Sequence, residues 1–378
     1  MLKSYIHKCA LDRLENMIDP GHVRATEQLH ADIWKGKPLP YVPCIIDMAV
    51  PDDWPHYPFI EAWEDAEKNL MNSLGGIYCG ALIKDDRLYQ IRPEYGVVNI
   101  PETLGIPSII TNQGNSMSEG FNNTEKVREL IKRGPPDFND THSKKVEEFE
   151  HFTREALKPY DRLSQAVHLT LPDTQGPFDL ACLVWGSQIF LALYDEQELV
   201  GELMNFVTEA FIRYNMRHKH LTGEPVDSAY HICGLKLVRG GVRICDDSAT
   251  LVSIEMYNRL IKPYNLRAFA PFDGGWLHYC GNGNHLLDEM LDMEPLHYLH
   301  LGNPDMHDFL DVVKRTTAAG KVLFWSGALE KIQEAFELAG RSRLLVLAEN
   351  RYQAKDLPDA RKRLEHVRAG QTIARAKW

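Results

Sequence analysis

From residue 166 to the C-terminus, short apolar runs that suit β-strands alternate with segments whose apolar residues recur at helical spacing. The predicted strands lie at 166–171, 242–245, 275–279, 296–300, 322–325 and 344–347. Alternation of this kind is typical of βαβ units and therefore of a parallel sheet. A strand at 41–48 and another near 78 or near 108 bring the total to about eight, which favours a closed (β/α)8 TIM barrel over an open sheet.

The N-terminal part of the chain follows a different pattern. Apolar positions recur at helical spacing from about residue 8 to residue 34, and Pro20-Gly21 interrupts them. We therefore expect residues 1–40 to be a helical N-terminal extension that covers the bottom of the core. Residues 41–378 are then expected to form the TIM barrel.

The segment that follows the first strand predicts a mixture of helix and strand. A helix is expected at 59–74, because apolar residues recur there at helical spacing. The stretch after it reads as rich in β-structure, with candidate strands at 78–83, 88–91 and 108–111.

Composition narrows the class of protein. A chain of 378 residues with 44% hydrophobic and 25% charged residues is typical of a globular protein. Its net charge of −11 argues against general nucleic-acid binding, because the protein has no excess of cationic side chains to neutralise phosphates. No apolar run is long enough for a transmembrane helix, and the N-terminus lacks the apolar core of a signal peptide. The seven cysteines include no CxxC pair, so we expect reduced thiols in a cytoplasmic protein.

His278 and Cys280 carry the clearest candidate chemistry. They are separated by one residue at the end of a predicted strand, so their side chains share one face. The carboxyl end of a barrel strand is where active sites lie. The pair is therefore either half of a zinc site or two polar groups in a substrate pocket, because catalytic zinc needs three protein ligands. The candidates for a third ligand are Glu349, Asp246, Asp247 and Asp47.

Other candidates follow strand ends. Asp246-Asp247 and Asp47 lie where a general base is expected, although a loop or helix-capping carboxylate is an equally good interpretation. Gln175 and Gly176 lead into a helix whose free N–H groups can hold an anion, and the alternative is a tight strand-to-helix turn. Asn282 lies in a glycine-rich turn with the same two interpretations. We take Gln175, Gly176 and Asn282 as candidate substrate-binding residues.

Several of these segments together resemble the uroporphyrinogen decarboxylase-like superfamily. Residues 175–181, reading QGPFDLA, with Gly186 after them, are similar to its "gGPfxlA…G" segment. Residues 246–257 are similar to its "gDD.a.lSpe.y" segment, and residues 278–282, reading HYCGN, to its "HxCGn" segment. The resemblance covers 166–326 well and implies a TIM barrel.

The superfamily holds at least two chemistries. Uroporphyrinogen decarboxylases use no metal and carry an N-terminal Arg-x-x-Gly-Arg loop, whereas residues 45–53 of this chain contain no arginine. The methyltransferases of the other branch use methylated corrinoid proteins and bind zinc through a His-x-Cys…Cys set. His278 and Cys280 match the first two zinc ligands. No cysteine matches the third, and Glu349 stands in the corresponding strand.

We therefore expect a methyltransferase that transfers a methyl group to or from a corrinoid on a partner protein, with zinc as the candidate metal. In this expectation His278, Cys280 and Glu349 are metal ligands, and Asp246, Asp247 and Asp47 are catalytic. The alternative is a cofactor-free decarboxylase of a tetrapyrrole or other carboxylated small molecule. A third is a protein that only binds a corrinoid or porphyrin. A homodimer is compatible with a large acidic barrel, and neither nucleic acid nor a membrane is an expected partner.

Overall fold

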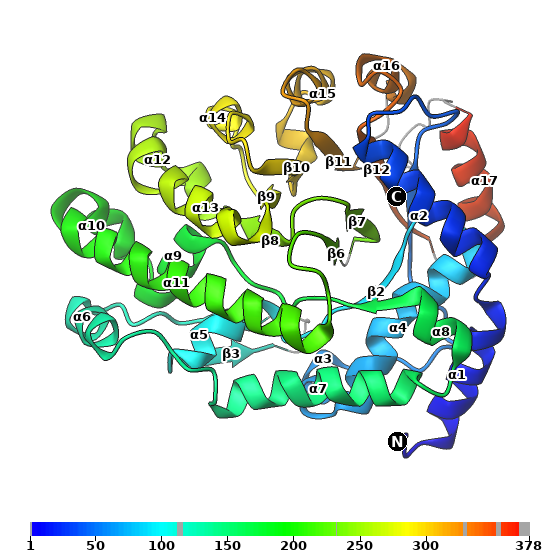
Figure 1. The fold of residues 1–378 in the computed structure, drawn as a ribbon, viewed down its shortest axis with the longest axis horizontal. Coiled ribbons are helices and arrows are strands. Elements are labelled where there is room, and N and C mark those ends of the chain that lie inside the picture. The colour runs from blue at the N-terminus through cyan, green and yellow to red at the C-terminus, as the bar shows by residue number, and fades with distance from the viewer. Residues whose placement is uncertain (1, 112–115, 232, 328–330, 353–356, 370–378) are drawn as a thin grey trace.

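The computed structural model describes residues 2–111, 116–231, 233–327, 331–352 and 357–369, without the side chains of 349–352. Its largest sheet has six strands, all parallel, in the order β1-β12-β11-β10-β9-β8. These strands are β1 (Cys44–Met48), β8 (Val242–Cys245), β9 (Gly275–Tyr279), β10 (Leu296–Leu301), β11 (Val322–Gly327) and β12 (Leu344–Tyr352). Figure 1 shows them along the inner side of an arc of helices.

Burial explains why these segments are strands. Every residue of β11 is buried, and β9 and β10 are each buried at all positions but one. A parallel strand that is covered on both faces is expected to read as a continuous apolar run, as residues 322–325 of β11 do. The parallel sheet predicted from the alternating pattern is confirmed.

Two more parallel strands form a separate pair, β2 (Tyr89–Ile91) with β5 (Val167–Leu169). Single backbone hydrogen bonds join the flanks of this pair to the two edge strands of the large sheet. The N–H of Asp86 donates to the carbonyl of Cys44 on β1 over 3.0 Å, and the N–H of Gly176 donates to the carbonyl of Cys245 on β8 over 2.9 Å. Closure of the eight strands into a barrel stays a prediction.

One strand predicted from the sequence is wrong. Residues 78–83 form no strand but the end of α4 (Ala66–Ile83), which is buried on almost every side. A helix buried all round shows no amphipathic period, so its apolar run looks like a strand. Residues 108–111 do include β3 (Ser108–Ile110), yet it pairs antiparallel with β4 (Ser116–Ser118) outside the parallel sheet. The parallel strand in this region is β2.

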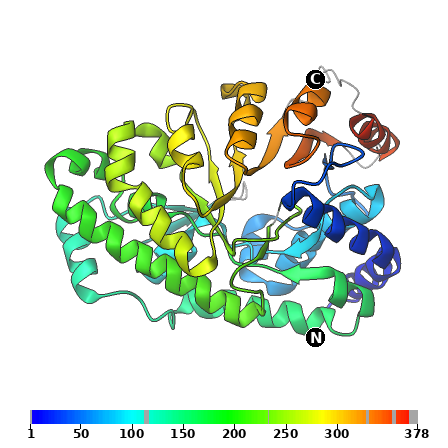
Figure 2. The ribbon, with the colours of Figure 1, turned by 45° about the horizontal axis from the view of Figure 1, so that its top comes forward.

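Helices surround the strands (Figure 2). Those in the first half of the chain are α1 (Tyr5–Met17), α2 (Pro20–Trp34), α3 (Phe59–Glu64), α4, α5 (Asn99–Thr103), α6 (Thr124–Arg133), α7 (Thr141–Leu157), α8 (Asp161–Ala166) and α9 (Pro177–Trp185). Those in the second half are α10 (Ile189–Asp195), α11 (Gln197–Thr222), α12 (Ile254–Leu260), α13 (Lys262–Phe269), α14 (Leu287–Leu291), α15 (Phe309–Ala318), α16 (Ile332–Leu338) and α17 (Leu357–Arg368). Short 3-10 turns include η2 (Ser248–Leu251).

A hairpin that was not predicted from the sequence lies at the centre of Figure 1, inside the arc of helices. It consists of β6 (Ala229–His231) and β7 (Leu235–Leu237), which pair antiparallel. The His231 ring packs against Trp276 of β9 at a centroid distance of 3.9 Å. On the other side, His30 of α2 accepts a hydrogen bond from the N–H of Lys236. Helix α2 is therefore fixed to the core through this hairpin.

In the part of the chain that the structure describes, no single helix is both long and apolar enough to cross a membrane. Helices α9 and α10 reach that length and composition only together, and the chain bends by 104° between them.

Candidate metal and substrate sites

Strand register brings the thiol of Cys245 next to His278. Cys245 on β8 and His278 on β9 are directly paired neighbours in the parallel ladder, so their side chains leave the sheet on the same face. Cys280 follows on that same face, with its Sγ 3.4 Å from Nε2 of His278. The shared face predicted for His278 and Cys280 is therefore observed as a direct contact.

Asp247 completes a cluster at the carboxyl ends of β8 and β9. One donor atom each from Cys245, Asp247 and His278 lie within 4.8 Å of one another, the spacing at which three side chains can hold one metal ion. Oδ1 of Asp247 lies 3.8 Å from Nε2 of His278 and accepts a hydrogen bond of 2.6 Å from the N–H of Cys280. We call Cys245, Asp247, His278 and Cys280 the β8–β9 cluster.

A chain of hydrogen bonds supports His278 from behind. Its Nδ1 lies 2.8 Å from Nδ1 of His300 on β10, and Nε2 of His300 lies 2.9 Å from the Ser326 hydroxyl on β11. If His278 donates from Nδ1, His300 accepts and then donates to Ser326 from its other nitrogen. That tautomer leaves Nε2 of His278 as a lone pair facing the cluster, which is the arrangement that metal-bound histidines use.

Burial keeps His278, Cys245 and Cys280 of the β8–β9 cluster neutral. Burial, followed by the charge of Arg243, lowers the pKa of His278 to about 3, so the imidazole is neutral. Burial, followed by the charge of Asp247, raises the pKa of Cys280 to about 11. Burial also raises the pKa of Cys245 well above its ordinary value. Without a bound cation, both thiols hold their protons at neutral pH.

Two glycines allow the close packing around these thiols. A Cβ on Gly302 would lie 2.5 Å from the Sγ of Cys280, and a Cβ on Gly176 would lie 2.4 Å from the carbonyl oxygen of Cys245. Gly176 is thus in contact with the strand that carries Cys245, and its N–H is used in a hydrogen bond to that strand. Any side chain at Gly176 would push against the end of β8.

Asp246 and Asp247 point to opposite sides. Asp246 is buried away from the cluster, where its Oδ2 accepts a hydrogen bond of 2.8 Å from Asn265 of α13. Its pKa is raised well above the ordinary value by burial and by the nearby Asp179. Asp179 in turn accepts hydrogen bonds from the N–H groups of Asp247 and Ser248, which fixes the turn after β8. Of the two adjacent aspartates, only Asp247 therefore reaches the cluster.

The remaining predicted residues lie elsewhere. Gln175 is buried beside Gly176, and Asn282 is exposed in a turn where its Oδ1 accepts from the N–H of Asn284. Glu349 belongs to β12, but its side chain lies outside the described residues. Asp47, on β1, lines a different part of the molecule.

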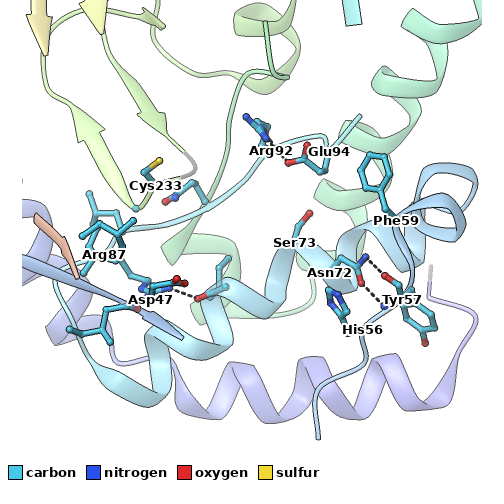
Figure 3. Close-up of a pocket in the computed structure, with 18 of the residues that line it drawn as sticks. Asp47, His56, Tyr57, Phe59, Asn72, Ser73, Arg87, Arg92, Glu94 and Cys233 are labelled. Atoms are coloured by element: carbon cyan, nitrogen blue, oxygen red, sulfur yellow. Dashed lines mark hydrogen bonds and ion pairs between the residues drawn. The ribbon is translucent and has the colours of Figure 1, made fainter. Parts of the chain in front are cut away.

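That part is a cavity of about 1030 Å³ beside β1, β2 and α4, which we call the β1–β2 cavity. Figure 3 shows Asp47 and Arg87 at one end of it, Tyr57 and Phe59 at the other, and Ser73 of α4 between them. The lining also includes Ile45, Ile46, His56, Pro58, Asn72, Gly76, Ile77, Leu88, Gln90, Arg92, Glu94, Cys233, Gly234 and Leu347.

A bridge of charged side chains runs from the β1–β2 cavity towards the β8–β9 cluster. Arg92, which lines the cavity, contacts Asp173 over 2.9 Å. Asp173 also contacts Arg243 of β8 over 3.2 Å, and Arg243 precedes Cys245 by two positions. The two sites are thus linked through Arg92, Asp173 and Arg243.

The sequence reading missed Cys245, His300 and Ser326. The signal for Cys245 was present, because Cys245-x-Asp247 repeats the one-residue spacing of His278-x-Cys280 at the end of the preceding strand. His300 and Ser326 carried no such signal, since only the register of β10 and β11 brings them behind His278.

Comparison with known proteins finds a likeness in fold to a solved structure. A methyltransferase from Methanosarcina mazei superposes with a TM-score of 0.61 at 18% sequence identity, over 88% of this chain and 97% of the other. At this identity the likeness concerns the fold. No family model and no curated protein sequence matches the chain.

Proposed function

We propose that the protein is a methyltransferase that moves a methyl group between a corrinoid on a separate protein and a small molecule, at a zinc site in the β8–β9 cluster. The observation that carries the proposal is the convergence of Cys245, Asp247 and His278, with Cys280 beside them. The fold shared with a methyltransferase and the His278-x-Cys280 motif both agree with it. We also propose that the eight parallel strands close into a barrel whose carboxyl end carries this site.

The donor set fits zinc. Zinc takes thiolate sulfur, imidazole nitrogen and carboxylate oxygen at about 2.0–2.3 Å, which puts tetrahedral ligands about 3.3–3.8 Å apart. The 3.8 Å between Asp247 and His278 and the 3.4 Å between His278 and Cys280 lie in this range. Burial raises the pKa values of both thiols, so a thiolate ligand would form only with the metal bound. The proposed ligands are Cys245, Asp247 and His278, with Cys280 as a further donor.

When bound, zinc would lower the pKa of a thiol substrate and so supply a thiolate nucleophile at neutral pH. The residues of the chain provide the rest. His278 would present Nε2 as a lone pair when its Nδ1 donates to His300 and His300 donates to Ser326. The backbone N–H of Asp247 donates to Asp179, and its carboxylate accepts from the N–H of Cys280. The carboxylate therefore stays beside the cluster.

The group transfer balances with these two substrates alone. With a thiol as the acceptor, the sulfur–carbon bond would form as the cobalt–carbon bond breaks, and the bonding electron pair would stay on the corrinoid. The thiol proton leaves to solvent when the thiolate forms. No external oxidant or reductant takes part.

The test is transfer of the methyl group from free methylcobalamin to mercaptoethanol, followed by the change in visible absorbance. We expect zinc-loaded wild-type protein to catalyse the transfer and His278→Ala to lose at least about a hundredfold in rate. His285→Ala, whose histidine lies on the turn before α14, serves as the matched control and should keep the wild-type rate. Equal rates for His278→Ala and wild type would contradict the proposal.

The alternative of a cofactor-free decarboxylase receives no support from the comparisons, and no observation in the structure favours it over the transferase. A carboxylated tetrapyrrole would need uncommitted cations. The two arginines that line the β1–β2 cavity are each already paired with carboxylates of the protein.

A further inference from the structure

The arginines that line the β1–β2 cavity are already paired. Arg87 donates to both carboxylate oxygens of Asp85. Arg92 donates to Glu94 and contacts Asp173 over 2.9 Å. A guanidinium that is neutralised by a carboxylate attracts a second anion only weakly, so an anionic ligand gains little from either arginine.

The carboxylates of the cavity are committed in the same way. Glu94 accepts hydrogen bonds from Arg92 and from the N–H of Gly96, and Asp47 has an interaction of its own. A cationic ligand therefore finds no free carboxylate among the described residues of the lining. Because a buried ion must exchange its hydration for an opposite charge, both cationic and anionic ligands are disfavoured here.

Most of the remaining wall is apolar. Phe59, Ile77, Leu88 and Leu347 line the β1–β2 cavity together with the two isoleucines of β1. A volume of about 1030 Å³ with mostly apolar walls and a few polar groups is typical of small-molecule sites. The ligand that fits this wall has an apolar body and no net charge.

One face of helix α4 contributes an accessible polar group to the cavity. Asn72, Ser73, Gly76 and Ile77 line it, and their spacing places them on the same side of the helix. Figure 3 shows Ser73 directed into the cavity, and its hydroxyl makes no hydrogen bond within the described residues. Because the Ser73 side chain is only half-buried, a ligand can reach this hydroxyl.

Gly76 is the second unusual feature of this face. Glycine is among the least favourable residues in a helix interior. The neighbouring Gly75 is required sterically, because a Cβ there would lie 2.8 Å from the side chain of Val50. A Cβ at Gly76 would meet no atom of the described residues within 4 Å, so packing does not require glycine at this position. Its missing side chain leaves room in the cavity beside Ser73.

We propose that the β1–β2 cavity binds an uncharged small molecule with an apolar body and one neutral hydrogen-bonding group, such as an alcohol. The apolar body lies against α4 at Gly76, and the neutral group bonds the Ser73 hydroxyl. This binding site does not rest on the proposed function, because its lining includes no residue of the β8–β9 cluster.

The test uses three probes of one shape and different charge: naphthylmethanol, naphthylmethylamine and naphthoate. Binding to the full-length protein is measured by isothermal titration calorimetry and ligand-observed NMR. We expect the alcohol to bind at least about tenfold more tightly than either ion, because each ion loses hydration without gaining a counter-charge. An amine or a carboxylate that binds as tightly as the alcohol, or an alcohol that does not bind, would overturn the proposal.

Substitutions at Gly76 locate the probe. Gly76→Leu extends a side chain into the cavity and should weaken naphthylmethanol binding at least about tenfold, with a smaller loss in Gly76→Ala. Gly201→Ala, at a helical glycine of α11 outside the cavity, is the matched control and should bind the alcohol as wild type does. Unchanged affinity in Gly76→Leu that is folded by circular dichroism would contradict the proposal. The probe series on wild-type protein decides it if that variant does not fold.

A substitution at Ser73 tests the polar end of the site. Ser73→Ala removes the hydroxyl and should weaken naphthylmethanol binding by about three- to tenfold. Ser187→Ala, at an exposed position after α9, is its control and should keep the wild-type affinity. Equal affinity in Ser73→Ala and Ser187→Ala would contradict the proposed hydrogen bond.

A further control separates this proposal from the zinc site. His278→Ala, and wild-type protein treated with a chelator, should bind naphthylmethanol with wild-type affinity, because the metal is not part of the cavity. Loss of binding in both would show that the alcohol occupies the metal site and would overturn the cavity assignment. Retained binding together with absent metal would defeat the proposed function alone.

Discussion

The β8–β9 cluster illustrates what single residues reveal before a structure is known. His278-x-Cys280 at a strand end places both side chains on one face, and the 3.4 Å contact between them follows from strand geometry alone. Cys245 could be placed only through the register of β8 against β9. The sequence left the choice between Asp246 and Asp247 open. It depends on which of the two side chains leaves the end of β8 on the side of the cluster.

At this scale, His300 is predicted to position His278 and not to bind metal itself. His300→Ala removes the partner of Nδ1 of His278, so the tautomer and ring orientation are no longer fixed. We expect zinc affinity, measured by chelator competition, to fall by about 10–100-fold. His297→Ala on the same strand, whose ring bonds the carbonyl of Asp273, is the control and should keep its affinity. Equal affinity in the two variants would remove the positioning role.

Gly176 is predicted to be required for packing at the end of β8. In Gly176→Ala, the new Cβ would meet the carbonyl oxygen of Cys245 at 2.4 Å and Cγ2 of Ile244 at 2.6 Å. We expect the free energy of unfolding in urea to fall by about 1–3 kcal/mol. Gly76→Ala on α4 has no atom within 4 Å of the added Cβ and should leave stability unchanged or slightly raised. A neutral Gly176→Ala variant would contradict the packing described for this strand end.

Elements were predicted well where their period was clear and poorly where burial hid it. Strands β8 to β11 fall close to their predicted positions, since buried parallel strands form short apolar runs between helices. Helix α4 begins after the cap at Asp65 and continues through 78–83. Its surroundings bury it almost entirely, so its sequence shows no helical period there. The β6–β7 hairpin was missed because its two strands are only three residues each, too short to show alternation.

The contact between α2 and this hairpin is predicted to depend on pH through Glu27. Burial raises the pKa of Glu27, but hydrogen bonds from His168, Lys236 and Tyr230 outweigh it and lower the pKa from 4.5 to about 2. A carboxyl with a lowered folded-state pKa stabilises the fold above its unfolded pKa, and this stabilisation is lost as pH falls. The window of loss therefore runs from about pH 4.5 down to about pH 2.

Glu27→Gln tests this linkage. Between those two pH values, wild type should lose about 2 kcal/mol more unfolding free energy than Glu27→Gln, because the amide does not titrate. Chemical denaturation at a series of pH values measures the difference. Glu209→Gln, at an exposed position of α11, should follow the wild-type curve. Parallel curves for wild type and Glu27→Gln would show that the carboxylate does not hold α2 to the hairpin.

For the whole molecule, the structure joins a six-stranded parallel sheet, a parallel pair and an outer layer of helices into one fold shared with a methyltransferase of 18% identity. The sequence predicted the parallel sheet from alternation alone. It could not show how the β2–β5 pair meets β1 and β8, because those joins include hydrogen bonds from Asp86 and Gly176, which lie outside the strands. The β1–β2 cavity was likewise invisible, since its walls come from segments far apart in the chain.

Zinc is predicted to stabilise the whole molecule, because the ligands of the β8–β9 cluster come together only when β8 and β9 are paired. A ligand that binds only the folded state raises the unfolding temperature with its concentration. We expect added zinc to raise the melting temperature of chelator-treated wild-type protein and not that of His278→Ala, as followed by differential scanning calorimetry. The same upward shift in both proteins would point to zinc bound elsewhere.

The most direct test of the account is the metal content of the purified protein, measured by elemental analysis for wild type, His278→Ala, Cys245→Ala and Cys280→Ala. Cys182→Ala, a thiol on α9 outside the cluster, is the control. The account predicts about one equivalent of zinc in wild type and in the control, loss in His278→Ala and Cys245→Ala, and weaker retention in Cys280→Ala. Wild-type protein that holds no metal after zinc is offered back, or His278→Ala and Cys245→Ala proteins that retain wild-type zinc, would contradict it.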